Sequence, residues 1–273
     1  MNRIIHNPRQ NMTAKFDAFP YQHEAFMAVR DLDYAAIFHE QGLGKTKIAI
    51  DLMLYWMECR NIDTVLVVTK KTLVNNWVEE FAAHTNLRSK VLGTNKGANF
   101  YAFNSASRVI ITNFETISGE KDRFSLFLKT RNVAIVIDES TKIKNPDAKL
   151  TRDFFELAPL FKIRVIMTGT PVANRPYDVW AQIYFLDNGE SLGADFKEFK
   201  KACDLSNDLE TDDDKKDNFE SVVSQIYTRI KPFTVRETKN SGIISLPKKN
   251  YHDIIVDFEK KQREMYEHLR REM

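Results

Sequence analysis

The stretch Ala35-Ala36-Ile37-Phe38-His39-Glu40-Gln41-Gly42-Leu43-Gly44-Lys45-Thr46 decides how the rest of the chain is interpreted. Its first four residues are apolar and predict a buried strand, and the residues after Thr46 have the apolar spacing of a helix. The glycine-rich turn between them ends in Gly-Lys-Thr. A strand, a tight turn and a helix N-terminus together form the arrangement that binds phosphate groups through backbone N–H groups.

Each residue type in this loop has a chemical reason to be there. Glycines let the backbone approach phosphate oxygens closely, Lys45 would reach the β- and γ-phosphates, and the Thr46 hydroxyl would ligate Mg²⁺. The strict pattern asks for glycine at the position of His39. A flexible turn before an amphipathic helix is therefore the alternative interpretation.

The composition is that of a globular protein with a substantial core. The chain has 273 residues, of which 43% are hydrophobic and 29% charged, and its net charge of +2 gives no global argument for nucleic acid binding. Cys59 and Cys203 have no CxxC neighbour, so neither a zinc site nor a disulfide framework is predicted. No apolar run approaches the ~20 residues of a membrane span, and the N-terminus lacks the apolar core of a signal peptide. We therefore predict an intracellular, cytoplasmic protein of bacterial or viral type that does not contact membranes; the nucleus is not excluded.

Strand-like and helical patterns alternate through the first two thirds of the chain. Strands are predicted at residues 35–38, 64–69, 90–92, 109–112, 133–138 and 164–168, and helices at about 46–58, 71–84, 114–129 and 148–158. Such alternation implies parallel strands joined by right-handed crossovers, which is a doubly wound α/β sheet. Ligands bind at the carboxyl ends of the strands in such sheets, so polar residues that end strands are the candidates for function.

The strand predicted at 133–138 delivers two adjacent carboxylates, Asp138 and Glu139, to its carboxyl end. Adjacent side chains point to opposite sides of a strand, so the two can have different roles. Asp138 could hold Mg²⁺, and Glu139 could orient or deprotonate the water that attacks a γ-phosphate. A solvated acidic turn is the alternative. The phosphate loop upstream in the same sheet favours the metal interpretation, because a metal that bridges phosphates needs such a carboxylate.

The next predicted strand ends in Thr168-Gly169-Thr170-Pro171, where two hydroxyls flank a glycine. These hydroxyls could hydrogen-bond Glu139 or the γ-phosphate and so sense hydrolysis. An ordinary polar turn explains the pattern equally well.

The character of the chain changes after about residue 187. A lysine-rich helical piece at 196–201 is followed by an acidic run at 207–214, which we interpret as a solvated loop. Helical spacing returns at 218–230 and again in the tail, residues 257–273.

Taken in order, these motifs resemble the first RecA-like lobe of superfamily-2 helicases, and most closely that of Swi/Snf-type double-stranded DNA translocases. The corresponding stretches are Pro20-Tyr21-Gln22 for the adenine-recognising Q motif, residues 40–46 for motif I, 67–81 for motif Ia, 110–115 for motif Ib, 138–141 for motif II and 168–171 for motif III. The subtype is indicated by Lys144-Asn145, Asn174, Asp178-Val179-Trp180, Phe185-Leu186, residues 235–239, Leu246-Pro247, Gln262 and Tyr266. The chain departs from the family pattern at His39, Gln41 and Thr141, where Asp, Met and His are usual.

The resemblance implies a fold, cofactors and site residues. The fold is a RecA-like P-loop NTPase lobe with a helical C-terminal extension, and the cofactors are ATP and Mg²⁺. ATP would be bound by Tyr21, Gln22, Gly42, Leu43, Gly44, Lys45 and Thr46, the metal by Thr46 and Asp138, and catalysis would rest on Lys45, Asp138 and Glu139. Coupling would involve Thr168, Gly169 and Thr170, and the backbone of double-stranded DNA would be contacted by Thr69, Lys70, Lys71, Thr112 and Asn113. A basic cluster, Lys142, Lys144, Lys149 and Arg152, either adds to that DNA surface or is a solvated helix start.

The same resemblance divides the chain into four parts. Residues 1–18 are a lead-in segment, 19–187 the ATP-binding lobe, 188–256 a helical protrusion with a return segment, and 257–273 a helix leading toward a second lobe that this chain lacks. The function it implies is the motor lobe of a DNA-dependent ATPase that needs a second RecA-like lobe, in cis or in trans. A nucleotide- or DNA-binding half-motor without turnover is the alternative, and a P-loop kinase or GTPase is disfavoured by the Thr-Gly-Thr-Pro and Tyr-Gln motifs.

Overall fold

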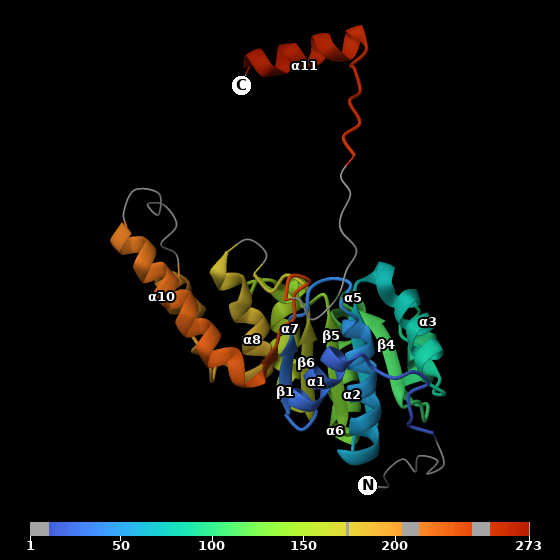
Figure 1. Ribbon diagram of the computed structural model, residues 1–273. Helices are drawn as coiled ribbons and strands as arrows, with labels where there is room; N and C mark the ends of the chain where they lie inside the picture. Colours follow the sequence, from blue (N-terminus) through green and yellow to red (C-terminus); the bar gives the residue numbers. More distant parts are fainter. Residues whose placement is uncertain (1–10, 173–174, 204–212, 242–251, 273) are drawn as a thin grey trace.

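The computed structural model describes residues 11–172, 175–203, 213–241 and 252–272 (Figure 1). Its centre is a seven-stranded sheet with the order β3-β4-β2-β5-β6-β1-β7, in which every pair is parallel. The strands are β1 Tyr34–Ile37, β2 Thr64–Thr69, β3 Ser89–Val91, β4 Val109–Asn113, β5 Val133–Asp138, β6 Ile163–Met167 and β7 Thr234–Val235.

Helices occupy the connections between the strands and most of the C-terminal third. The α-helices are α1 Pro20–Val29, α2 Lys45–Cys59, α3 Val74–His84, α4 Lys96–Phe103, α5 Phe114–Gly119, α6 Lys121–Thr130, α7 Lys149–Leu157, α8 Trp180–Asp187, α9 Phe196–Cys203, α10 Asp213–Ile230 and α11 Lys260–Glu272. Short 3₁₀ turns are η1 Lys71–Leu73, η2 Ser140–Ile143, η3 Ala158–Leu160, η4 Pro176–Val179 and η5 Lys231–Phe233.

All six predicted strands are present, each within one residue of its predicted ends, and the doubly wound parallel sheet is confirmed. The helix predicted at 114–129 is instead two helices, α5 and α6, which meet at Glu120. The sequence did not predict α4, which begins after Asn95, whose side chain accepts hydrogen bonds from two backbone N–H groups of the helix. It also did not predict β7, whose two residues are too few to show a period.

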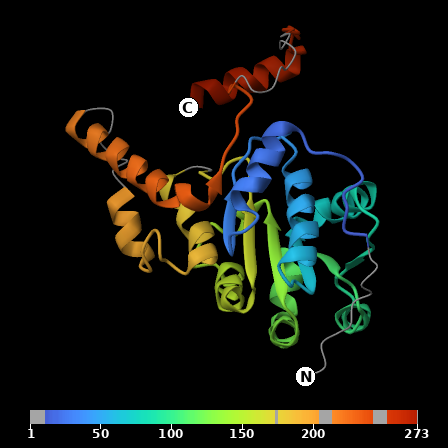
Figure 2. The same ribbon diagram turned by 60° about the horizontal axis from the view of Figure 1, so that its bottom comes forward.

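Two hydrophobic cores lie on the two faces of the sheet. One core is built with α1, α2 and α3, and the other with α4 to α8, so that the sheet is covered on both faces (Figure 2). Every residue of β2 is buried. A strand buried on both faces must be apolar throughout, which explains why these strands read as continuous apolar runs.

The return segment, residues 234–241, brings a late part of the chain back to the first strand. Its strand β7 pairs with β1, with Thr234 opposite Ala36 and Val235 opposite Ile37. Beyond it, α11 lies away from the sheet (Figure 1), and the apolar side chains Ile254, Ile255 and Val256 are exposed. Asn174, most of the acidic run and Leu246-Pro247, which carried parts of the sequence interpretation, lie outside the described residues. None of the helices in the described part of the chain is long and apolar enough to cross a membrane.

Candidate functional site

The loop between β1 and α2 has the conformation that its glycines permit. Gly42 and Gly44 have positive φ angles of 86° and 67°, in the left-handed region that favours glycine. Gly44 is also the N-cap of α2, so the first backbone N–H groups of that helix have no intrahelical partner. Lys45, the first residue of α2, folds back over the loop, and its Nζ donates to the carbonyl oxygens of His39 at 2.9 Å and Glu40 at 3.3 Å. These two carbonyls hold the ammonium group at the mouth of the loop.

The ammonium group of Lys45 is more than half buried. Burial lowers the pKa of Lys45, while the nearby carboxylates of Asp138, Glu139 and Glu40 act in the opposite direction. A partly desolvated cation gains more from an anionic ligand than a solvated one does, because the effective dielectric constant around it is lower. Lys45 is therefore suited to bind a phosphate chain.

Asp138 ends β5 and accepts three hydrogen bonds. Its Oδ2 accepts from Trp77 Nε1 at 2.8 Å and from Thr69 Oγ1 at 3.2 Å, and its Oδ1 accepts from the backbone N–H of Glu139 at 3.0 Å. Burial raises the pKa of Asp138, and the hydrogen bond from Trp77 lowers it. The three donors fix the orientation of a carboxylate that burial alone would tend to neutralise.

Glu139 follows in a conformation that is uncommon for a residue with a side chain. Its φ is 57° and its ψ is 48°, in the left-handed region. Non-glycine residues in this region cost free energy and are often found at functional sites. The conformation turns the Glu139 carboxylate to Lys70, whose Nζ lies 3.0 Å from Oε2.

The start of α1 packs on the phosphate loop. Gln22 caps α1 by accepting from Phe19 N at 2.9 Å, and the Tyr21 hydroxyl donates to Leu43 O at 3.3 Å. A Cβ atom added to Gly44 would lie only 2.1 Å from Gln22 Nε2, so this contact requires glycine. The two residues predicted to recognise adenine are thus in direct contact with the predicted phosphate loop.

The loop after β6 reaches the phosphate loop from the other side. Thr168 is buried and its Oγ1 accepts from the backbone N–H of Thr170 at 3.2 Å, whereas Thr170 itself is exposed. A Cβ atom on Gly169 would lie 3.2 Å from Gln41 N, which is closer than an ordinary contact. The glycine therefore allows the two loops to pack tightly.

An open cleft with a volume of about 640 Å³ lies beside the phosphate loop. It is lined by Gln22, Gly42, Gly44, Lys45, Thr46, Asp138 and Glu139, which the sequence predicted, and by Phe16, Asp17, Phe19, Gln41, Lys47, Asn76, Glu80 and His84, which it did not. The predicted residues that line it come from α1, the phosphate loop and the end of β5, and the fold brings them together. The predicted residues Tyr21, Leu43, Thr168, Gly169 and Thr170 are not among its lining residues.

The cleft contains a donor set that suits Mg²⁺. The Thr46 hydroxyl and the Asp138 carboxylate both line it, and oxygen ligands of this kind are what Mg²⁺ prefers. No group of three or more His, Cys, Asp or Glu side chains able to hold a metal by itself occurs within the described residues. At phosphate sites Mg²⁺ uses one or two protein ligands together with water and the phosphates, so Thr46 and Asp138 are enough to propose such a site.

Two residues near the cleft were missed as functional candidates. Trp77 appeared in the sequence only as part of a motif, and its hydrogen bond to Asp138 depends on how α3 packs beside β5. Gln182 in α8 accepts from the Ser140 hydroxyl at 2.7 Å and donates to Pro171 O at 3.0 Å. It therefore links the segment after Glu139 to the segment after Thr170. The only sequence signal for Gln182 was a glutamine in an otherwise apolar helix.

The residues predicted to contact DNA differ in their exposure to solvent and in their hydrogen-bond partners. Thr69 and Thr112 are fully buried, and their hydroxyls donate to Asp138 and to Leu92 O, so we withdraw these two from the candidate contacts. Lys70 is paired with Glu139. Lys71 is exposed, whereas Asn113 is buried and its Oδ1 caps α5 by accepting from Thr116 N and Oγ1. Both residues line a hollow of about 350 Å³ at the carboxyl ends of β3 and β4.

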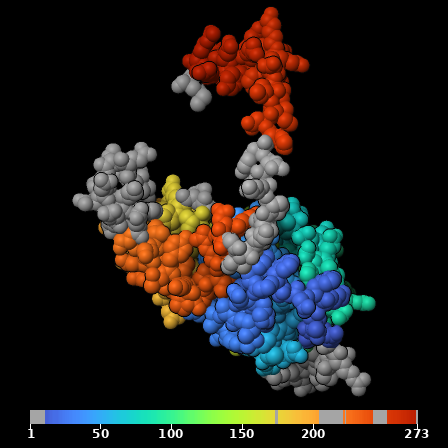
Figure 3. Space-filling model, in the orientation of Figure 1, coloured from blue at the N-terminus to red at the C-terminus, as the bar shows by residue number. Residues whose placement is uncertain are grey.

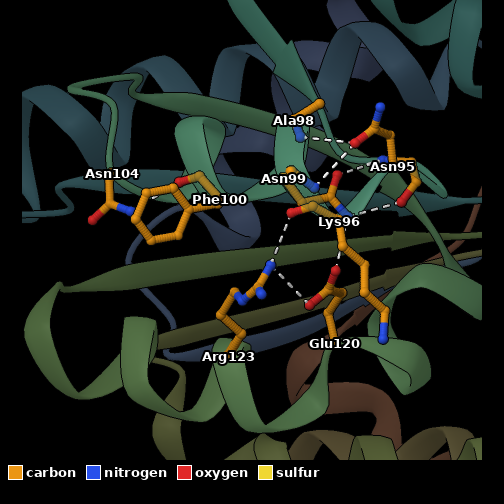
Figure 4. A network of polar contacts seen from close by, with 10 residues as sticks. Asn95, Lys96, Ala98, Asn99, Phe100, Asn104, Glu120 and Arg123 are labelled. Carbon is orange, nitrogen blue, oxygen red and sulfur yellow. Dashed lines mark hydrogen bonds and ion pairs between the residues drawn. The ribbon is translucent and has the colours of Figure 1, made fainter.

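The wall of this hollow is held by a polar network (Figure 4). The carboxylate of Glu120 is buried, accepts from Asn99 Nδ2 at 3.0 Å and is paired with Arg123 at 3.2 Å. Arg123 also donates to Lys96 O at 3.1 Å, which ties α6 to the start of α4. The Lys96 residue thus lies on a rigid rim beside Lys71.

The basic cluster after Glu139 is mostly engaged with nearby acceptors. Lys144 is paired with Asp178 at 3.1 Å, Lys142 with Glu115 at 3.7 Å, and Arg152 donates to the backbone carbonyl of Asp147. The interpretation as a solvated helix start describes this cluster better than that of a free DNA surface.

Trp77→Phe is expected to weaken binding of Mg-ATP by on the order of tenfold, the scale of one hydrogen bond to a charged group. The reason is that Asp138 loses its shortest donor, which lets burial raise its pKa further. The matched control is Trp56→Phe, because Trp56 is also buried and donates to a backbone carbonyl, that of Arg30, away from the cleft. Calorimetric titration of both variants measures the effect, and equal losses in both would contradict a role for Trp77 at Asp138.

Binding of Mg-ATP is also expected to weaken as the pH falls from neutral into the acidic range, because a metal ligand must be deprotonated. Burial raises the pKa of Asp138, so protonation begins at a higher pH than for an exposed aspartate. ATP has its own titration in this range, so the measured quantity is the affinity ratio between the unmodified chain and Asp138→Asn. That ratio should shrink with falling pH. A constant ratio would show that protonation of Asp138 does not compete with binding of Mg-ATP.

Comparisons with known proteins identify the family of this chain. Residues 21–273 match the family described as the SNF2-related domain. The human protein "SWI/SNF-related matrix-associated actin-dependent regulator of chromatin subfamily A member 1" is 32% identical over 236 residues, which are 83% of this chain and 21% of that protein. The "ISWI chromatin-remodeling complex ATPase ISW1" of Saccharomyces cerevisiae is 27% identical over 237 residues, 84% of this chain and 20% of the relative.

Solved structures give the same result. The Sulfolobus solfataricus SWI2/SNF2 ATPase core in complex with dsDNA has a TM-score of 0.69 and 25% identity, over 85% of this chain and 47% of that one. The same core domain solved separately has a TM-score of 0.65 and 25% identity, over 97% of this chain and 53% of that one. The chain spans about half the length of these solved relatives and about a fifth of the curated ones. The family match and the parallel sheet lead to one conclusion: the chain belongs to the SNF2-related family and forms the N-terminal, RecA-like lobe of a Swi/Snf-type ATPase core.

Proposed function

We propose that this chain is the ATP-binding lobe of a DNA-dependent ATPase of the translocase type, which hydrolyses Mg-ATP when joined to a second RecA-like lobe. The observation that carries the proposal is the single cleft that unites Lys45 and Thr46 with Asp138 and Glu139, beside Gln22. The known relatives include chromatin-remodelling ATPases, which supports ATP use by this lobe.

In this mechanism the residues of the cleft act in sequence. Lys45 leaves the carbonyls of His39 and Glu40 and binds the β- and γ-phosphates, where its partial burial strengthens the attraction. Thr46 and Asp138 would hold Mg²⁺, which would neutralise charge on the phosphates. Trp77 keeps the Asp138 carboxylate oriented toward the cleft.

Glu139 has the role of orienting or deprotonating the attacking water. Its Oε2 is paired with Lys70, which stabilises the ionised carboxylate and makes it a weaker base until that pair opens. Lys70 is about half exposed and is free to move to another anion. Binding of a DNA phosphate by Lys70 would release Glu139, which offers a direct link between DNA and hydrolysis.

The link from the nucleotide to the rest of the lobe runs through two close contacts. Gly169 packs against Gln41 of the phosphate loop, and Gln182 joins Ser140 to Pro171. A change at the γ-phosphate would reach the Thr168-Gly169-Thr170 loop through these contacts. This gives that loop the coupling role expected from its position.

DNA would be contacted through its backbone along the carboxyl ends of β2, β3 and β4. The exposed candidates are Lys70 and Lys71, with Lys96 on the rim of the hollow; Asn113 lines the same hollow but is buried. Contacts of amines and amides with phosphates carry no sequence information. The solved Sulfolobus solfataricus relative is in complex with double-stranded DNA, which supports this choice of partner.

DNA binding is expected to be weak, insensitive to sequence and reduced by salt, with a slope of log K against log salt near −3 if about three phosphates are neutralised. Fluorescence anisotropy with two duplexes of unrelated sequence measures both properties. Lys71→Ala should make the slope shallower by about one unit. Lys162→Ala should leave it unchanged, because Lys162 is exposed and precedes β6, at the amino ends of the strands. A flat salt response, or a strong preference for one duplex, would argue against backbone tracking.

One observation favours a half-motor without turnover as the second candidate. Among the described residues, none of the cleft-lining side chains is an arginine. The test is ATPase activity of the chain together with a second lobe, with and without double-stranded DNA. Stimulation by DNA supports the motor, and nucleotide binding without any turnover supports the half-motor.

The division of the chain into 1–18, 19–187, 188–256 and 257–273 is part of the same proposal. So is an intracellular location, which a DNA-dependent ATPase requires.

A further inference from the structure

The return segment runs alongside the phosphate loop as well as alongside β1. Beyond β7 the pairing continues through Phe38 N, which donates to Val235 O at 2.8 Å, and Glu40 N, which donates to Glu237 O at 2.8 Å. Figure 3 shows this segment, red-orange, at the surface beside the blue N-terminal part of the chain. The first residues of the phosphate loop are therefore held by a strand from the C-terminal part of the chain.

This pairing places Lys239 against the loop. Its backbone N–H donates to Glu40 Oε2 at 2.8 Å, and its Nζ lies 4.0 Å from Glu40 Oε1. A Cβ atom added to Gly42 would lie 3.7 Å from Lys239 Nζ, so the ammonium group sits next to the turn that would hold the phosphates. The neighbouring acid, Glu237, is engaged with the backbone N–H of Thr238 at 2.9 Å and does not take the place of Glu40.

The charge of Glu40 needs such a partner. Its side chain is 43% exposed and stands two residues before Gly42, close to the position of a polyphosphate that carries several negative charges. A carboxylate at that distance repels each phosphate charge, and the repulsion grows with the number of phosphates. An ammonium group beside the carboxylate opposes this repulsion of the phosphates.

We propose that Lys239 is a positioning residue of the nucleotide site: it compensates Glu40 and so sets the preference of the loop for triphosphates over diphosphates. The inference rests on the proposed function, since it assumes that the loop binds ATP. It adds to that function a residue from outside the phosphate loop and from the segment that leads out of the lobe.

The backbone and side-chain contributions of Lys239 can be separated by substitution. Lys239→Met keeps the backbone N–H that bonds Glu40 but removes the ammonium group. Lys239→Arg keeps the positive charge, and Glu40→Gln removes the negative charge while keeping an oxygen acceptor. Lys231→Met is the matched control, because Lys231 is exposed on η5 at the amino end of the same segment.

The experiment titrates each variant of the full chain with fluorescent ATP and ADP analogues in the presence of Mg²⁺. Lys239→Met should bind the ATP analogue about five- to tenfold more weakly, the scale of one partly screened charge, and should lose distinctly less affinity for the ADP analogue. Lys239→Arg and the double variant Lys239→Met/Glu40→Gln should both recover ATP binding. Thermal unfolding of each variant shows that the folds are comparable.

Three results would overturn the proposal: unchanged ATP affinity in Lys239→Met, equal losses for ATP and ADP, or no recovery in the double variant. Equal losses would mean that the side chain only supports the shape of the loop. Lys45→Ala, titrated in the same series, tests the proposed function separately. If Lys45→Ala abolishes binding and Lys239→Met does not change it, the compensation by Lys239 fails while the nucleotide site stands.

Discussion

Replacing Lys45 by alanine is expected to remove binding of Mg-ATP almost completely. The loss should be about 2–4 kcal/mol, the scale for removing one partner of a desolvated charge pair. The ammonium group of Lys45 donates to the carbonyl oxygens of His39 and Glu40. Phosphate oxygens of a bound nucleotide would replace these two acceptors. Isothermal titration calorimetry with Mg-ATP measures the loss directly.

The variant should remain folded, which separates lost binding from lost structure. The substitution removes the hydrogen bonds of Lys45 to His39 O and Glu40 O, but it also removes a partly desolvated charge, whose pKa burial lowers. Because these two effects oppose each other, the midpoint of thermal unfolding without nucleotide should be close to that of the unmodified chain. Equal ATP affinity in the variant and the unmodified chain would refute the assignment of the phosphate loop.

The second large effect concerns hydrolysis by residues 1–273 alone. An arginine that contacts the γ-phosphate is worth on the order of 10³–10⁵ in rate in other nucleotide hydrolases. Within the part of the chain that the structure describes, the cleft has no arginine. The arginines near the motifs are directed elsewhere: Arg131 to Ser105 O, Arg164 to Ala158 O, Arg152 to Asp147 O and Arg175 to Tyr177.

We therefore expect residues 1–273 by themselves to hydrolyse ATP barely above background, with little stimulation by DNA. A second RecA-like lobe, supplied in cis or as a separate chain, should restore turnover. Glu139→Gln should then abolish turnover while leaving ATP binding in place, because the amide keeps the shape but cannot accept a proton. Phosphate release assays with and without double-stranded DNA measure these effects.

Asp147→Asn is a suitable control for Glu139→Gln, since Asp147 is exposed and lies outside the cleft. It should leave turnover of the assembled motor unchanged. Strong DNA-stimulated hydrolysis by residues 1–273 alone, lost in Glu139→Gln, would overturn the requirement for a second lobe.

The sequence by itself determined the class of fold and singled out the main candidates for site residues. Residues 133–138 are an apolar run that ends in a carboxylate, and residues 35–46 join an apolar run to Gly-Lys-Thr. Both signals are contained within a few neighbouring residues, where strand period, glycine conformation and helix start act locally. Lys45, Asp138 and Glu139, which these local signals single out, line the same cleft, and their roles stay predictions.

Local sequence patterns did not predict whether a polar side chain at the end of a strand is exposed or buried. Thr112 follows the same strand-end logic as Asp138, yet its hydroxyl is buried and donates to Leu92 O. Which polar side chain at a strand end faces solvent depends on the loop that covers that part of the edge. In this fold the residues after β3 cover the end of β4, and nothing in the sequence around Thr112 indicates it.

Only the tertiary structure decided which distant residues support the site. Trp77 donates to Asp138 across 61 residues, Ser140 to Gln182 across 42, and Lys239 to Glu40 across 199. Each contact exists because the sheet places β5 between β2 and β6, and β7 beside β1. Strand order is set by the packing of the whole chain, since any of these strands could pair with another apolar strand, and so no local sequence pattern encodes it.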